Sequence, residues 1–280
     1  MRVLLASLTA SATLTLAACG SDHATTSPDG ATATDAASSV DAPAADASSG
    51  ACAGTYCEDF ESYPAGAITN GATLGPWTVK TSGTITLAAI DSVKPHSGAR
   101  ALHITVPAGT AAGATLYMLA SSGLVPTNNL YGRAMVYFSD ATGFAAPIGV
   151  HSWLFQGLGN SPTSGGAVSM NWGDGAAKMQ LNYHPATTPE QSVQGIGQMA
   201  AGAWHCLQWQ YDGSGTPPAN AATVWLDSAV AVSVPQTKGW EFATPWNAFN
   251  FGFMHYQTIT TATDVYLDDL VIGDAMIACP

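Results

Sequence analysis

A short segment near the end of the chain begins as an apolar strand and ends in three polar side chains that could do chemistry. Residues 250–257 read NFGFMHYQ. Because side chains alternate along a strand, Phe251, Phe253 and His255 are expected on one face and Tyr256 on the other. Histidine and tyrosine can each take and return a proton. The polar end is therefore a candidate for a site of proton transfer.

Other segments with strand-like alternation supply residues that would complete such a site. Elimination across a uronic acid needs a cation or an amide to neutralise the sugar carboxylate, and a His or Tyr to move protons. Arg133, one of only three arginines in the chain, is expected to hold the carboxylate. His151 and Tyr256 are expected to carry the protons. The residues expected to bind the substrate are Trp153, Asn182, Tyr183 and Gln257.

Glycoside hydrolysis is disfavoured, because it requires two carboxyl groups placed across the scissile bond. The glutamates of the folded part are Glu58, Glu61, Glu190 and Glu241, and no two of them are spaced to meet on one strand. Two functions of other classes stay open beside a lyase. They are a non-catalytic carbohydrate-binding module and a structural protein of the cell envelope without a ligand.

The elements that must position these side chains are strands. Short alternating runs such as ALHITV, KMQLNYH and ATVWLDS follow one another, separated by Gly, Pro, Asn and Asp. No long stretch has the apolar period of a helix, and no repeat of fixed length emerges, which disfavours a propeller. The pattern predicts an all-β fold, a sandwich or jelly roll.

The N-terminal part of the chain is not expected to belong to this fold. Residues 1–18 have one cation, then a short apolar stretch interrupted by Ser and Thr, which is typical of a signal peptide rather than a membrane span. The Leu-Ala-Ala sequence before Cys19 resembles the lipobox of bacterial lipoproteins, so Cys19 is expected to carry lipid. Residues 19–50 are Ala, Ser, Thr, Asp and Pro without aromatics, which predicts a disordered tether. The folded domain is expected at 51–280.

The charge of the chain restricts its partners. The formal net charge is −12, of which five units come from tether aspartates, and no basic patch is present. Nucleic acid is therefore disfavoured as a partner. Gly20 and Ser21, with no Asp directly after the cysteine, resemble the start of lipoproteins sent to the outer membrane. We expect a monomer in the bacterial cell envelope, lipid-anchored at the outer membrane or cell surface.

The cysteines of the folded domain predict two disulfides. Apart from Cys19 there are four cysteines, an even number in an exported chain. Three pairings are possible. We favour Cys52–Cys57, which closes a small loop, and Cys206–Cys279, which would join the C-terminus to a strand.

Several motifs carry a resemblance to a known family. They are WHCLQWQYDG, ATVWLDS and DVYLDDLVIG, together with CEDFESYPAG, HSGARALHI and NLYGRAMVYFS, and they cover nearly the whole domain. The chain resembles concanavalin-A-like lectin/glucanase jelly rolls, and looks similar to bacterial relatives of fungal cellulose-induced secreted proteins and polysaccharide lyases. The resemblance implies a jelly-roll sandwich of two antiparallel sheets. It also implies polysaccharide as the partner, with Arg, Gln or His, and Tyr as the lyase set.

The same resemblance implies a structural calcium ion. Asp268 and Asp269 are adjacent acidic residues on a strand that is expected to be buried, and hard oxygen ligands suit Ca²⁺. In related jelly rolls a calcium joins an N-terminal Glu, a loop and an Asp of the last strand. Here these positions correspond to Glu61, the loop Asp91–Ser97 and Asp268.

Overall fold

The structure is a computed structural model. It describes residues 52–280, except 84, 86, 110, 141–151, 160–166, 173–177, 185–188, 214–220, 239, 241 and 243. The expected signal peptide, Cys19 and the tether therefore lie outside the described residues, as does His151. None of the helices in the described part has the length and apolar character needed to span a bilayer.

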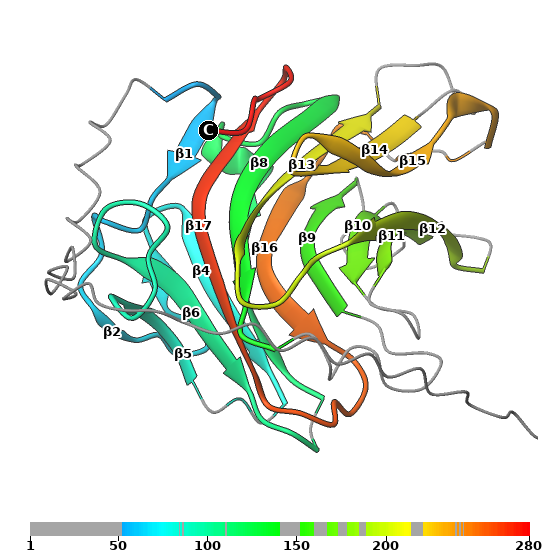
Figure 1. Ribbon diagram of the computed structural model, residues 1–280. Helices are drawn as coiled ribbons and strands as arrows, with labels where there is room; N and C mark the ends of the chain where they lie inside the picture. The colour runs from blue at the N-terminus through cyan, green and yellow to red at the C-terminus, as the bar shows by residue number, and fades with distance from the viewer. Residues whose placement is uncertain are drawn as a thin grey trace, which may run out of the picture. The chain divides into compact units, whose positions relative to one another are not determined.

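Two antiparallel sheets account for most of the described residues (Figure 1). The nine-stranded sheet runs in the order β15 (Ala229–Val234), β14 (Ala221–Leu226), β13 (Trp204–Asp212), β8 (Asn129–Phe138), β17 (Thr263–Gly273), β6 (Ala101–Val106), β5 (Leu87–Asp91) and β2 (Gly66–Ala67), and β1 (Tyr56–Glu58) also pairs with β17.

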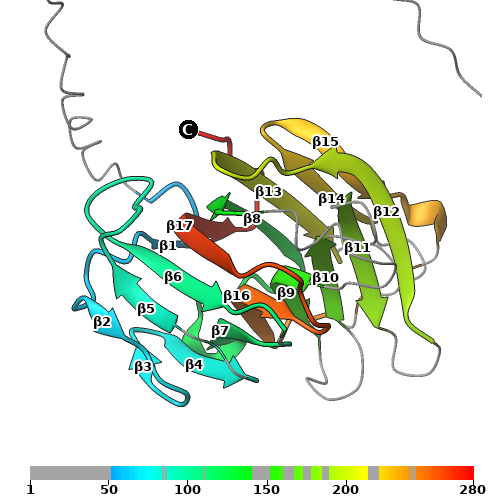
Figure 2. The same cartoon turned by 60° about the horizontal axis from the view of Figure 1, so that its bottom comes forward.

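The eight-stranded sheet has the order β12 (Gln191–Gln198), β11 (Lys178–His184), β10 (Ala167–Trp172), β9 (Ser152–Leu158), β16 (Ala248–His255), β7 (Gly113–Leu119), β4 (Trp77–Ser82) and β3 (Thr73–Leu74). Two short 3-10 helices, η1 (Ala120–Ser122) and η3 (Gln236–Lys238), connect strands. Figure 2 shows β5 and β6 in one layer and β4 and β7 in the other. The predicted jelly-roll sandwich of two antiparallel sheets is confirmed.

The interior is filled by the apolar side chains that alternate along each strand. Trp209 of β13 lies at its centre, stacked on Phe155 of β9 at 4.0 Å and on Phe249 of β16 at 5.7 Å between ring centroids. The neighbouring strand β8 must have a residue without a side chain at this point, because a Cβ on Gly132 would lie 1.9 Å from the Trp209 ring. These stacked rings join the two sheets through one continuous apolar core.

Both predicted disulfides are present. Cys52 is joined to Cys57 beside β1, and Cys206 of β13 is joined to Cys279 in the segment that follows β17. Gln208 of β13 also donates a hydrogen bond to the carbonyl of Ile277 at 2.7 Å. The C-terminal segment is therefore held across the outer face of the nine-stranded sheet.

The two disulfides should contribute unequally to stability. They close segments with sequence separations of 73 for Cys206–Cys279 and 5 for Cys52–Cys57. Because a cross-link restricts the unfolded chain more when its loop is longer, removal should lower the unfolding free energy by about 4–5 and about 2 kcal/mol, respectively. The comparison is C206S/C279S against C52S/C57S in denaturant melts. Equal losses would contradict this account.

Candidate functional site

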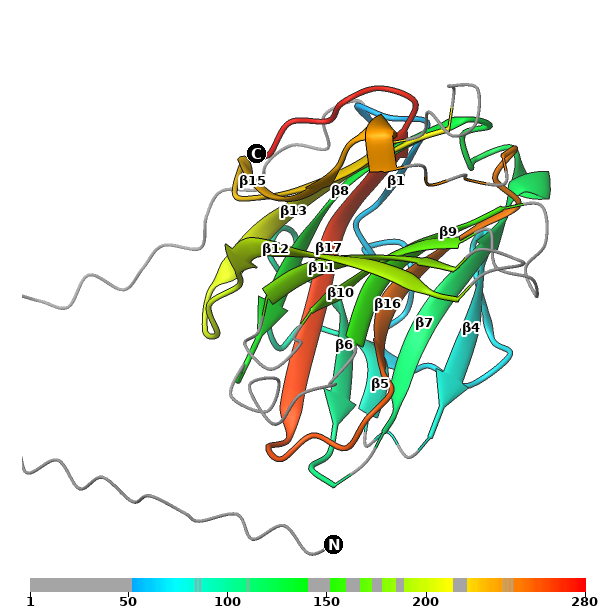
Figure 3. The ribbon, with the colours of Figure 1, turned by 90° about the vertical axis from the view of Figure 1, so that its right-hand side faces the viewer.

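The outer face of the eight-stranded sheet carries amide, hydroxyl and aromatic side chains. On β11, Met179, Leu181 and Tyr183 belong to the core, so Gln180 and Asn182 point to the opposite, outer side. The same alternation sends out Tyr117 from β7, Asn250 from β16 and Gln156 from β9, whereas Trp153, which is not part of the core cluster, lies where the register between β9 and β16 shifts. Figure 3 shows these strands side by side. None of the eight strands contains an Asp or a Glu.

Three of these residues form a chain of hydrogen bonds that ends at a carboxylate. Gln180 Nε2 donates to Asn182 Oδ1 at 2.6 Å, and Asn182 Nδ2 donates to Glu190 Oε1, just before β12. An ionised carboxylate only accepts, so Glu190 sets the direction of the whole chain. Gln180 and Asn182 are only 2% and 1% exposed. Gln180 Oε1 is left at the far end, where no donor among the described residues reaches it.

A second amide pair lies closer to the middle of the sheet. Asn250 Nδ2 donates to Gln156 Oε1 at 3.1 Å, and their strands pair at this position. Asn250 Oδ1 is buried, and within the described residues no donor reaches it. Two amide carbonyls on this face are thus acceptors without a donor among the residues that the structure describes. Since an unmet buried acceptor is unfavourable by roughly 1–3 kcal/mol, such atoms point to a ligand that donates.

Trp153 and Tyr256 lie beside the Gln180–Asn182–Glu190 chain. Trp153 donates its Nε1–H to the Tyr256 hydroxyl at 2.7 Å. Trp153 is 5% exposed, whereas Tyr256 is 57% exposed. The pKa of Tyr256 is raised, because neighbouring groups remove part of its water shell and because the Glu190 carboxylate lies nearby. Tyr256 is therefore protonated at neutral pH, as a phenol that can donate a hydrogen bond or a proton.

Of the residues expected at the site, Trp153 and Tyr256 are hydrogen-bonded to each other, and Asn182 is joined to Glu190, which lies near Tyr256. Gln257 follows Tyr256 directly and is half-buried. The prediction that Tyr183 binds substrate must be corrected, because Tyr183 faces the core. Its ring stacks there on Trp240, with 5.4 Å between the ring centroids. The alternation of β11 places Tyr183 opposite Asn182, so both cannot bind one ligand. The predicted proton carrier His151 lies outside the described residues.

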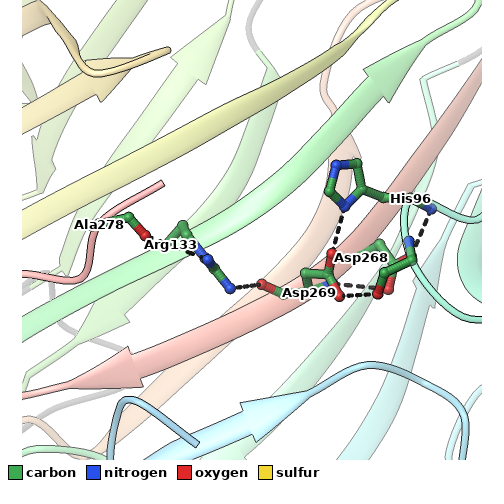
Figure 4. A network of polar contacts seen from close by, with 6 residues as sticks. His96, Arg133, Asp268, Asp269 and Ala278 are labelled. Atoms are coloured by element: carbon green, nitrogen blue, oxygen red, sulfur yellow. Dashed lines mark hydrogen bonds and ion pairs between the residues drawn. The ribbon is translucent and has the colours of Figure 1, made fainter. Parts of the chain in front are cut away.

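The prediction that Arg133 holds a substrate carboxylate must also be corrected, because Arg133 lies on the nine-stranded sheet. Leu130, Ala134 and Val136 of β8 face the core, so Arg133 points outward from the nine-stranded sheet. There its guanidinium donates to the carbonyls of Ala278, at 3.3 Å, and Asp269, at 3.5 Å (Figure 4). The whole core separates it from Tyr256. Arg133 thus supports the C-terminal segment and cannot hold a substrate carboxylate beside Tyr256.

The sequence analysis missed several residues of this face. Gln156 and Asn250 were not singled out, and Glu190 was considered only as a hydrolase carboxylate. The available signal was alternation: Asn250 stands between Phe249 and Phe251, both in the core, so a polar residue there must face outward. His255, which shares the Phe251 face, is buried, and burial lowers its pKa to about 4.

A separate polar cluster holds the loop that precedes β6. Asp268 Oδ2 accepts the backbone N–H groups of His96 at 2.8 Å and Ser97 at 3.3 Å (Figure 4). From the other side, Glu61 Oε1 accepts the N–H groups of Ala99 and Arg100, both at 2.7 Å. Within the described ranges, no three His, Cys, Asp or Glu side chains gather as metal ligands do.

The carboxyl group of Asp268 has a strongly shifted pKa in this cluster. It is fully buried, and burial together with the adjacent Asp269 carboxylate raises its pKa to about 8. Asp269 has its own partners, since it contacts His96 Nδ1 at 2.5 Å and the Ser97 hydroxyl at 2.6 Å. The two carboxylates thus bind one loop through different groups.

No protein-family model and no curated protein sequence matches the chain. Among solved structures, it is similar to a cellulose-induced protein, Cip1, with 16% identity, a TM-score of 0.56, and coverage of 80% of this chain and 100% of the other. An endo-β-1,4-glucuronan lyase from Trichoderma reesei has 15% identity and a TM-score of 0.51, covering 74% and 94%. The alginate lyase vAL-1 from a Chlorella virus has 10% identity and a TM-score of 0.50, covering 72% and 94%.

These neighbours have the jelly-roll fold and match the resemblance that the sequence motifs carried. At such low identity the likeness extends to the fold alone.

Proposed function

We propose that the outer face of the eight-stranded sheet binds polysaccharide. The observation that carries the proposal is the chain Gln180–Asn182–Glu190, which lies next to the Trp153–Tyr256 pair. Amides and carboxylates bind sugar hydroxyls, and aromatic rings pack against the apolar faces of sugars. The names of the structural neighbours, two of which are polysaccharide lyases, support this class of ligand.

Cleavage of a uronic-acid polymer by β-elimination is a second candidate. The observation in its favour is the Tyr256 phenol beside the Glu190 carboxylate, since a protonated tyrosine can donate to the leaving oxygen. Without Arg133, the amides of Gln180 and Asn182 would have to neutralise the sugar carboxylate. Hydrolysis receives less support, because the strands of this sheet offer no pair of carboxyl groups.

Tyr256→Ala should weaken polysaccharide binding about tenfold, or roughly 1.4 kcal/mol. The side chain is largely exposed, so its loss should leave the fold intact. Tyr131→Ala is the matched control, because Tyr131 is a half-buried tyrosine on the outer face of β8 in the other sheet. Arg133→Gln should likewise leave binding unchanged. Affinity electrophoresis against a panel of soluble polysaccharides measures each effect. Equal binding by the Tyr256→Ala and Tyr131→Ala variants would reject this face as the site.

A structural calcium ion remains a proposal for the 96–100 loop. Glu61 and Asp268 hold this loop from two sides, and Asp268 is a buried carboxyl beside a second one, which suits a cation. The fit is partial, because both side chains already accept backbone N–H groups. A bound ion would add positive charge between the loop and β17.

A chelator should therefore lower the melting temperature, and added Ca²⁺ should restore it in proportion to the logarithm of its free concentration. Asp268→Asn should abolish the response. Asp59→Asn, at an exposed carboxylate near Glu61, should retain it. Identical melting curves with and without chelator would argue that the amide hydrogen bonds alone hold the loop.

The lipid anchor is also a proposal, supported by the Leu-Ala-Ala-Cys sequence. We expect Cys19 to be the mature N-terminus and to place a monomeric domain at the bacterial envelope, at the outer membrane or cell surface. Cys19→Ser should release the protein from membranes, since acyl chains supply the anchoring energy. Intact mass of the extracted protein decides this: a chain that starts elsewhere and lacks acyl mass would refute the anchor.

A further inference from the structure

We infer that the ligand of this face is a neutral, hydroxyl-rich polysaccharide rather than a polyuronate. The inference rests on the proposed function, and it decides between that function's two forms. A neutral polymer has no carboxylate next to the bond that would break, so β-elimination has no activated proton to remove. Binding without elimination is then the activity of this face.

The first argument is the location of every cation in the domain. Residues 51–280 contain six Lys and Arg against fourteen Asp and Glu. Three of the six cations contact groups of the nine-stranded sheet or its loops, and a fourth, Lys238, lies directly after β15 of that sheet. Arg100 donates to the carbonyls of Glu61 and Tyr63, Arg133 supports the C-terminal segment, Lys94 lies over the Tyr137 ring of β8, and Lys238 lies in η3.

The two remaining cations lie on this face, but they are too few and too far apart to pair with a carboxylate on every sugar of a polyanion. Lys80 of β4 lies over the Tyr117 ring at 3.5 Å, and β4 is five strands from β11 in the sheet, about 24 Å at the usual strand spacing. Lys178 begins β11 on the same side as Gln180. It pairs in register with Gln198, at the end of β11 far from Glu190. The residues between 84 and 243 that the structure does not describe contain no Lys or Arg.

A polyuronate would bring one carboxylate with every sugar to this surface. Removing a carboxylate from water without a cationic partner is unfavourable by several kcal/mol. The excess of acidic side chains over the whole domain would also repel the polymer at longer range. A neutral polymer meets neither penalty.

The second argument is the kind of hydrogen bond that the face lacks. Because Glu190 only accepts, the amide chain is directed toward it and leaves Gln180 Oε1 as a buried acceptor. Asn250 Oδ1 is another. A sugar hydroxyl that reached either atom could donate to it, whereas an ionised carboxylate has no proton to give. The unmet groups on this face therefore match alcohols and not anions.

The test compares polymers that differ only in charge. Polyglucuronate, polymannuronate and polygalacturonate are each paired with the same polymer after its carboxyls have been reduced to primary alcohols. Binding to the full-length protein is measured by calorimetry at low and high salt. We expect at least one reduced polymer to bind tenfold or more tighter than its parent, with the difference shrinking as salt screens the repulsion.

The outcomes distinguish failure of the neutral-ligand inference from failure of the proposed function. If a parent polyuronate binds as tightly as its reduced form, or releases an unsaturated product that absorbs ultraviolet light, the neutral-ligand inference fails and the proposed function stands. If no polymer of either kind binds, the proposed function fails and the inference fails with it.

A pair of charge-adding variants gives an independent measure. Ser192 is exposed on β12 and pairs with Asn182, whereas Ser233 is exposed on β15 of the other sheet. If missing cations keep polyuronates from this face, Ser192→Lys should raise their affinity several-fold at low salt. Ser233→Lys should not. Equal effects of the two lysines would show that charge at this face does not select the ligand, and would overturn the inference.

Discussion

Trp209 sits where the two sheets meet, and the rest of the arrangement depends on its contacts. Its indole lies against the backbone of Gly132 on one side and stacks on Phe155 and Phe249 of the other sheet. With these rings in the interior, the inward side chains of β8, β9 and β16 are set as well, except where the register shifts between β9 and β16. The remaining side chains of those strands have only the outer faces left.

The two outer faces have become chemically different. On the nine-stranded sheet the outward residues bind the protein's own segments: Arg133 supports the C-terminal segment, and Asp268 and Asp269 hold the 96–97 backbone and side chains. His103 lies between Asp91, at 2.5 Å, and Asp264, at 3.2 Å, and stacks on Tyr266. Most of the charge of the domain's strands is thus used internally on this face.

The eight-stranded sheet is the opposite case. Its strands contain no acidic residue, and its outward amides are buried and joined into chains. Buried polar groups persist where they are satisfied or where a ligand satisfies them. Their concentration on the sheet without acidic residues is the physical reason for proposing a sugar-binding face here and not on the histidine-rich side.

By itself the sequence predicted strands throughout the domain, the class of fold, two disulfides with a favoured pairing, and the side of a regular strand on which a residue lies. These features depend on local alternation, turn residues and cysteine parity, which are readable along the chain. Only the tertiary structure decided which strands are neighbours. β8 lies between β13 and β17, and β9 lies between β10 and β16, so partners come from distant segments. Arg133 and Tyr256 are residue types that suit one reaction. They are placed by different sheets, however, so the core lies between them.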